Sequence, residues 1–238
     1  MERLFRVIRS CVVGSALLVC SASILISAQT VRPVIMEYRS VAHGKFELVN
    51  NGLQPLNVVL QPCSFSIGED GTGKFRPLES QIHVRLSAMS FRIAPQQSHW
   101  VFYEASADTL PAWFVIYSTM AAPPNSQGFN VQIELPHTVY LVQKEQLGKD
   151  DIVVKSAKYD SARHRIVIDV ANVSPRLGRA LDWQVASKGK KLSQNGFPLL
   201  PQGRRRLEAE WKWPNPPERI SLRFEHFTIK QAVSELAD

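Results

Sequence analysis

Residues 129–142 read Phe-Asn-Val-Gln-Ile-Glu-Leu-Pro-His-Thr-Val-Tyr-Leu-Val and carry the clearest strand signal of the chain. Its apolar side chains fall at odd-numbered positions, with His137 among them: Val131, Ile133, Leu135, Val139 and Leu141. A period of two places these side chains on one face of a β-strand. Pro136 interrupts the run, and because proline cannot donate to a β-ladder, the strand should be bulged or lie at a sheet edge. The stretch therefore predicts a long edge strand with one apolar face.

Similar strand signals recur along the chain, from Lys45–Val49 to Arg219–Phe224, as short β-branched or aromatic runs between turn residues. Many short strands at roughly regular spacing predict an all-β fold made of immunoglobulin-like β-sandwiches. The polar connector Gln143–Asp151 divides the chain. We expect an N-terminal domain over residues 29–145, a C-terminal domain over residues 150–227, and a tail over residues 228–238 that is a short helix or a frayed end.

The first 28 residues predict a secretory signal peptide. Arg3, Arg6 and Arg9 precede the apolar run Cys11–Ile26, which Ser27 and Ala28 close. We expect cleavage after Ala28 and a periplasmic location, since the run is short for a membrane span of about 20 residues. An uncleaved N-terminal anchor and a lipoprotein modified at Cys20 are the alternatives. Without the leader only Cys63 remains, so no intramolecular disulfide can form.

Charge and motifs favour a binding protein over an enzyme. The chain carries 28 basic and 21 acidic residues, for a net charge of +7, and the charges are scattered apart from Arg204–Arg206. Scattered charge argues against a nucleic-acid surface. The triple arginine is interpreted as a turn leading into a strand, with an acidic partner or a membrane surface as the alternative.

The stretch Gly68–Lys74 has the glycine and lysine spacing of a phosphate-binding loop, but Phe75 stands where a Ser or Thr must reach the magnesium ion. A glycine-rich hairpin loop is the better interpretation. The six histidines share no metal-ligand spacing, and no nucleophile, base and orienting group can be nominated. We therefore expect no catalytic residues, no metal, no cofactor and no small-molecule substrate.

Several motifs occur in a fixed order: Phe46–Asn51, Phe91–Pro95, Leu110-Pro111, Trp113–Tyr117, Pro123-Pro124, Asn130–Leu135 and, in the second half, Val170–Val173. In this order they resemble the periplasmic pilus-assembly chaperones, the PapD-like family. The resemblance covers nearly all of the chain after the leader. It implies two immunoglobulin-like sandwiches set at an angle.

The resemblance also implies a function. In this family the long edge strand lends its alternating apolar side chains to an incomplete pilin-like subunit, a form of β-strand addition. Here the client-binding residues would be Val131, Ile133, Leu135, Val139 and Leu141. The partners would be secreted pilin-like subunits, with no nucleic acid, and an outer-membrane usher is left open as a second partner.

The chain departs from the family at the basic pair that holds the C-terminal carboxylate of the subunit. Tyr140 stands where the edge-strand lysine is expected, Thr138 is nearby, and Arg32 is taken as the first-strand arginine. A tyrosine can donate one hydrogen bond but brings no charge. This departure favours a second hypothesis, a structural or adhesive module of the cell envelope that has no chaperone activity.

Overall fold

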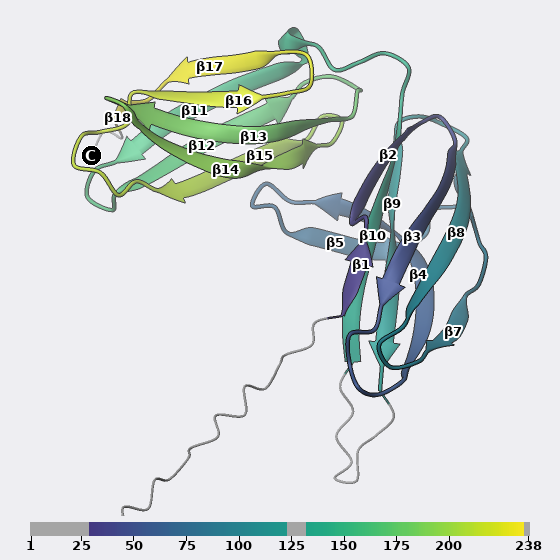
Figure 1. Ribbon diagram of the computed structural model, residues 1–238. Coiled ribbons are helices and arrows are strands. Elements are labelled where there is room, and N and C mark those ends of the chain that lie inside the picture. Colours follow the sequence, from purple (N-terminus) through teal and green to yellow (C-terminus); the bar gives the residue numbers. More distant parts are fainter. Residues whose placement is uncertain (1–28, 123–131, 236–238) are drawn as a thin grey trace, which may run out of the picture.

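The computed structural model describes residues 29–122 and 132–235, and these residues form two β-sandwiches (Figure 1). The prediction of an all-β fold with two sandwiches is confirmed. The predicted signal peptide lies outside the described residues. Within them, no helix is long and apolar enough to cross a membrane.

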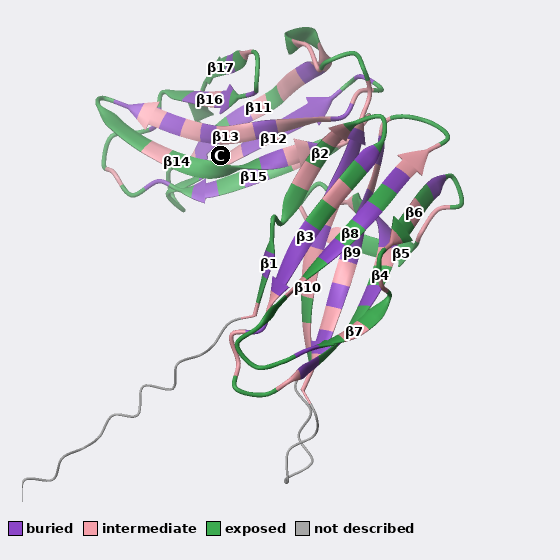
Figure 2. Ribbon diagram, turned by 45° about the vertical axis from the view of Figure 1, so that its right-hand side comes forward, coloured by how far each residue is buried: buried purple, intermediate pink, exposed green. Residues whose placement is uncertain are grey.

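The N-terminal sandwich contains strands β1 (Thr30–Arg32), β2 (Ile35–Arg39), β3 (Ala42–Val49), β4 (Leu56–Ile67), β5 (Gly73–Pro77), β6 (Ile82–Leu86), β7 (Ser90–Ile93), β8 (Ser98–Ala107), β9 (Ala112–Ala121) and β10 (Gln132–Val142). One sheet has the order β1-β3-β8-β6, and the other has the order β2-β10-β9-β4-β5, with β7 paired to β4. Alternating side chains of the two sheets meet in one core, in which Phe46, Leu48, Phe114 and Leu141 are fully buried. Figure 2 shows this alternation of buried and exposed positions along β8.

The C-terminal sandwich follows a short 3₁₀ turn, η1 (Lys149–Asp151). Its strands are β11 (Ile152–Asp160), β12 (Arg165–Asn172), β13 (Gly178–Ser187), β14 (Lys190–Leu199), β15 (Arg204–Glu210), β16 (Arg219–Arg223), β17 (Thr228–Ala232) and β18 (Ser234–Glu235). The two sheets have the orders β15-β12-β11-β18 and β14-β13-β16-β17 and enclose a second core around Trp211.

The expectation of a helical or frayed tail is wrong. Residues 228–232 form β17 and residues 234–235 form β18, which pair with β16 and β11 and so extend both sheets of the C-terminal sandwich. Ile229 explains the strand, because it is buried in the second core while Thr228 and Lys230 face solvent. Pairing with β16 from Thr228 to Ala232 keeps these residues extended, so the strand rests on this ladder and on the burial of Ile229.

A third apolar cluster joins the two sandwiches. Cys63, Phe65, Val115 and Tyr140 lie on the outer face of the N-terminal sandwich and pack with Leu177, which leads into β13. Burial raises the pKa of the Cys63 thiol, consistent with the small buried residue expected from the sequence. This cluster, which we call the joint, is therefore an apolar contact made by side chains of both domains.

Two sequence motifs without an assigned role meet beside this joint. The loop Gly68–Gly73 closes the β4–β5 hairpin, as predicted, and Figure 1 shows the hairpin reaching toward the C-terminal sandwich. The Arg206 backbone N–H donates to the Glu69 carbonyl oxygen across the domains at 2.7 Å. The Arg205 guanidinium lies over the Phe197 ring, 5.7 Å from its centroid, and also against Gly71. The triple arginine was interpreted as a turn leading into a strand, but all three residues lie within β15, and Arg205 and Arg206 form an interdomain contact.

Gly71 provides a test of this contact. Its φ is +91°, and a Cβ atom there would lie 2.6 Å from an Arg205 guanidinium nitrogen; Gly189 has φ +77° with nothing within 4 Å of such an atom. Alanine at either position carries the same kind of backbone strain, roughly 1–2 kcal/mol. Gly71→Ala should in addition displace Arg205 and speed hydrogen exchange at the Arg206 amide, whereas Gly189→Ala should leave that amide unchanged. Equal exchange in the two variants would contradict the contact.

Candidate functional site

Strand β10 has two neighbours along only part of its length. On one side it pairs antiparallel with β9 from Gln132 to Leu141. On the other side it pairs parallel with β2, but only from Thr138 to Val142. Among the described residues, Gln132–His137 therefore has no strand partner on that second side. The edge predicted from the sequence exists, but it is about half as long as expected.

The direction of the backbone groups follows from two hydrogen bonds. Thr138 N–H donates to the Val34 carbonyl at 2.8 Å, and the Val142 carbonyl accepts from Ser40 N–H at 3.3 Å. Backbone groups alternate in direction along a strand, so the even-numbered residues point toward this side. Gln132 and Glu134 accordingly present N–H and C=O groups to the open edge, and Pro136 presents only its carbonyl. Pro136 is tolerated because its missing donor faces the side without a partner strand.

The five predicted client-binding side chains have different environments. Val131 lies outside the described residues. Ile133 and Leu135 are partly exposed beside the open edge, and Leu135 packs on the core. Val139 and Leu141 are fully buried in that core, on the part of β10 that β2 covers. The shared face is as predicted, but Val139 and Leu141 are not available to a partner, because they already hold the two sheets together.

His137 marks the inner end of the open edge. It is fully buried, stacks on Phe46 with ring centroids 4.5 Å apart, and links both sheets through hydrogen bonds. Its Nδ1 lies 2.7 Å from the Pro33 carbonyl oxygen, and its Nε2 lies 3.0 Å from the Tyr103 hydroxyl. A carbonyl can only accept, so Nδ1 carries the proton and Nε2 accepts from Tyr103. The ring thereby ties the segment between β1 and β2 to β10, where the chain passes from one sheet to the other.

Acid should weaken this arrangement. Burial lowers the pKa of His137 to about 4, whereas an imidazole in an unfolded chain titrates near pH 6.5. Between pH 6.5 and pH 4, His137 is protonated in the unfolded chain but stays neutral in the folded protein. The contribution of neutral His137 to the free energy of unfolding is therefore fully present above pH 6.5 and is lost as the pH falls toward 4. The loss should reach about 3 kcal/mol.

The measurement is the free energy of unfolding from pH 7 to pH 4 in the wild type and in His137→Asn, which should lack this part of the pH dependence. An NMR titration of the His137 ring gives the pKa directly and does not require the variant to fold. A ring that titrates near pH 6.5 would contradict the account.

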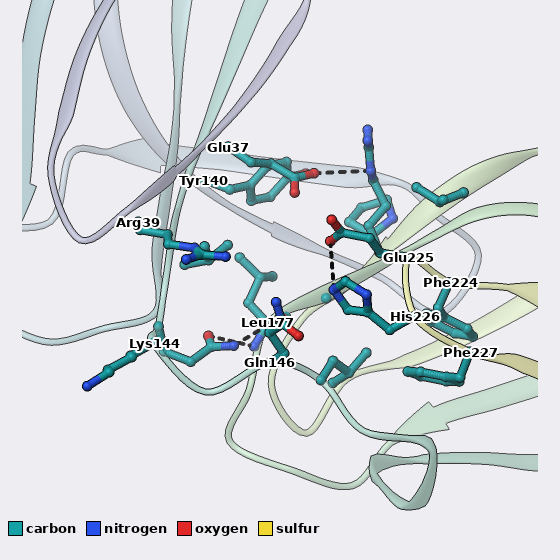
Figure 3. A pocket seen from close by; sticks show the side chains of 17 residues that line it. Glu37, Arg39, Tyr140, Lys144, Gln146, Leu177, Phe224, Glu225, His226 and Phe227 are labelled. Carbon is teal, nitrogen blue, oxygen red and sulfur yellow. Dashed lines mark hydrogen bonds and ion pairs between the residues drawn. The ribbon is translucent and has the colours of Figure 1, made fainter.

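A cavity of about 130 Å³ lies between the two sandwiches, above the covered half of β10 (Figure 3). Its walls come from β2, β10, the connector and the C-terminal domain, and its polar lining includes Glu37, Arg39, Tyr140, Lys144 and His226. Arg179 bridges the domains across this site, with Nε 3.1 Å from a Glu37 carboxylate oxygen. Gln143 adds a second bridge, because its side chain donates to the Leu177 carbonyl and accepts from the Leu177 N–H.

Of the three residues expected to hold a carboxylate, only Tyr140 lines this cavity. Burial raises the pKa of Tyr140 to about 12, so its hydroxyl is a neutral donor at physiological pH. Thr138 lies two residues before Tyr140 on β10, opposite Ile35, and does not line the cavity. Arg32 is on β1, where its Nε lies 2.7 Å from a Glu47 carboxylate oxygen, and it does not line the cavity. The structure does not bring Arg32 to the cavity, and its role as a carboxylate anchor stays a prediction.

Arg39, on β2, lines the cavity where the sequence analysis expected Arg32. It pairs with Val142 while Glu37 pairs with Tyr140, so Arg39, Glu37 and Tyr140 share one face of the sheet, and Figure 3 shows them on the same side of the cavity. Within the described residues Arg39 has no ion-pair partner. The signal that could have identified it is the alternation in Ile35–Arg39, which is short and follows Pro33.

Comparisons with known proteins show similarity of fold. No protein-family model and none of the curated proteins matches the chain. It is similar to the solved structure of the YadV chaperone, with a TM-score of 0.51 and 10% identity over 82% of this chain and 91% of that one.

Two further similar structures have lower TM-scores. The E. coli chaperone DraB has a TM-score of 0.49 and 14% identity over 83% of this chain and 90% of that one. A chain of the CsuC–CsuE chaperone–tip adhesion subunit complex from Acinetobacter baumannii has a TM-score of 0.48 and 12% identity over 88% of this chain and all of that one. At such identities the likeness to YadV establishes the fold alone, and it confirms the two-sandwich fold that the sequence resemblance implied.

Proposed function

We propose that this chain is a periplasmic chaperone that captures secreted, pilin-like subunits by adding the open half of β10 to their incomplete sheet. The observation that carries the proposal is the edge Gln132–His137, which pairs with β9 on one side and with no described strand on the other. YadV, whose fold this chain shares, is a chaperone, and that supports the proposal. The predicted leader supports the periplasmic location.

The open edge has the chemistry that strand addition needs. Exposed backbone groups on Gln132, Glu134 and Pro136 can pair with a partner strand, and each hydrogen bond contributes roughly 0.5–1.5 kcal/mol net. Ile133 lies on the opposite face of the strand from the Gln132 and Glu134 side chains, and among the described residues it is the partly exposed apolar side chain nearest the start of β10. Its full burial in a client groove adds at most roughly 1.5–3 kcal/mol. The hydrogen bonds supply affinity, and the apolar side chains select a client with a matching groove.

The interdomain cavity would hold the C-terminal carboxylate of the client. Arg39 supplies the positive charge, Tyr140 supplies a neutral hydroxyl donor, and Lys144 is a second cation in the lining. The positive partner thus comes from β2, while the β10 position that holds a lysine in the family holds Tyr140. Since β2 and β10 pair directly, the carboxylate anchor and the open edge are parts of one sheet and would fix the register of the client strand.

Ile133→Glu should abolish capture of the client, because a carboxylate cannot be buried in an apolar groove without a large penalty. The measurement is a pull-down from envelope extract with the tagged protein, with partners identified by mass spectrometry. Gln132→Glu adds the same charge one residue away on the polar face and is the matched control. Thermal melting of both variants establishes that the fold is kept.

Recovery of small, secreted β-rich subunits that is lost only with Ile133→Glu would support the chaperone. Recovery of fibre or wall components that is unaffected by Ile133→Glu would contradict it and favour the structural envelope module.

Arg39→Gln should weaken binding of a recovered subunit by about tenfold or more, since hydrogen bonds to charged groups contribute roughly 1.5–3 kcal/mol. Arg32→Gln removes an exposed arginine outside the cavity and should change affinity by less than about twofold. The affinity of each variant is measured for the subunit and for the same subunit with an extended C-terminus. If extension weakens binding to Arg39→Gln as much as binding to the wild type, Arg39 does not hold the carboxylate.

A further inference from the structure

One end of the C-terminal sandwich gathers positive charge. The cationic tip, as we name it, consists of Lys188, Lys190 and Lys191 at the β13–β14 turn, Arg219 at the start of β16, and Lys230 on β17. These five residues surround an open surface hollow of about 610 Å³, and all are exposed. Because β13 begins next to the interdomain joint and ends at this turn, the tip lies at the end of the domain that is remote from β10 (Figure 1).

The strand register explains why the cations gather there. Ala186 on β13 pairs with Lys191 on one side and Arg219 on the other, and Arg219 pairs in turn with Ala232. Basic side chains thus alternate with alanines across the sheet, so short alanine side chains separate the long, flexible basic ones. Neighbouring strands lie roughly 4.8 Å apart, so the four strands spread these charges over ~14 Å.

The charges of the tip are not neutralised within the described residues. No salt bridge joins any of the five cations to a described carboxylate, although Arg165, Arg206 and Arg223 of the same domain all have such partners. Glu218 is the one carboxylate that lines the hollow, and it accepts a hydrogen bond from Ser187 at 3.3 Å. Cations held close together repel one another, and an external anion relieves that repulsion.

We propose that the cationic tip docks the protein on an anionic phospholipid bilayer. Clusters of four to eight basic residues bind such surfaces, with each Lys or Arg contributing separately. The tip is open and spread out, so it matches an array of headgroup phosphates better than a single enclosed phosphate. No aromatic side chain lines it, which removes the stacking platform that single-stranded nucleic acids need.

This proposal does not rest on the chaperone activity. The tip and the open edge belong to different domains, so lipid binding at one end leaves the edge of β10 accessible. Docking at a membrane surface would place that edge where exported chains emerge.

The test is co-sedimentation with vesicles of phosphatidylcholine alone or mixed with phosphatidylglycerol. It uses the chain from Gln29 onward, which contains every residue of both cores. We expect binding that requires phosphatidylglycerol, weakens with salt, and falls by about tenfold or more in the variant Lys188→Gln/Lys190→Gln/Lys191→Gln.

A matched control removes the same charge elsewhere. Lys74→Gln/Arg85→Gln/Arg92→Gln replaces three exposed cations of the N-terminal sandwich and should reduce binding by less than about twofold. Equal losses in the two triple variants would overturn the proposal, since net charge alone would then explain binding. Absence of binding to phosphatidylglycerol, or full displacement by millimolar inorganic phosphate or an acidic peptide, would overturn it as well.

Discussion

The parallel pairing of β2 with only the second half of β10 determines which part of that strand is buried and which part stays open. It covers Thr138–Val142, allows Val139 and Leu141 to sit in the core, and leaves Gln132–His137 open. A fully paired strand would offer nothing to a partner, and a fully open one would be exposed to edge-to-edge aggregation. Pro136 and His137 lie at the boundary between the open and the paired part of β10. Pro136 lacks a backbone donor on the open side, and the His137 ring donates a hydrogen bond to the Pro33 carbonyl oxygen.

The same pairing connects the edge to the interdomain cavity. Arg39 and Tyr140 reach the cavity from the paired strands, and the second sandwich closes it through the Glu37–Arg179 ion pair and the Gln143–Leu177 hydrogen bonds. The third apolar cluster and the β4–β5 hairpin support the joint from the other side. The orientation of the domains therefore sets the shape of the proposed carboxylate anchor.

Much of this could be predicted from the sequence, and the failures have physical reasons. The alternation in residues 129–142 identified the strand and its apolar face, because period two depends only on the chain itself. It could not tell which of those side chains face the protein's own core, since that depends on β2, a short strand far away in the sequence. Arg39 was missed for the same reason: Ile35–Arg39 is largely exposed and shows its role only through its register with β10. The contact between the Gly68–Gly73 loop and Arg205 is likewise a product of tertiary structure.

Amide hydrogen exchange, resolved by residue, in the free protein and in its complex with a recovered subunit tests directly whether the open edge of β10 binds the client. We expect the amides of Gln132 and Glu134 to exchange rapidly in the free protein and to become strongly protected in the complex. The amides of Ile133 and Leu135 face β9 and should be protected in both states. Protection of Gln132 and Glu134 in the free protein, or no change on binding, would contradict the assignment of this edge as the client-binding strand.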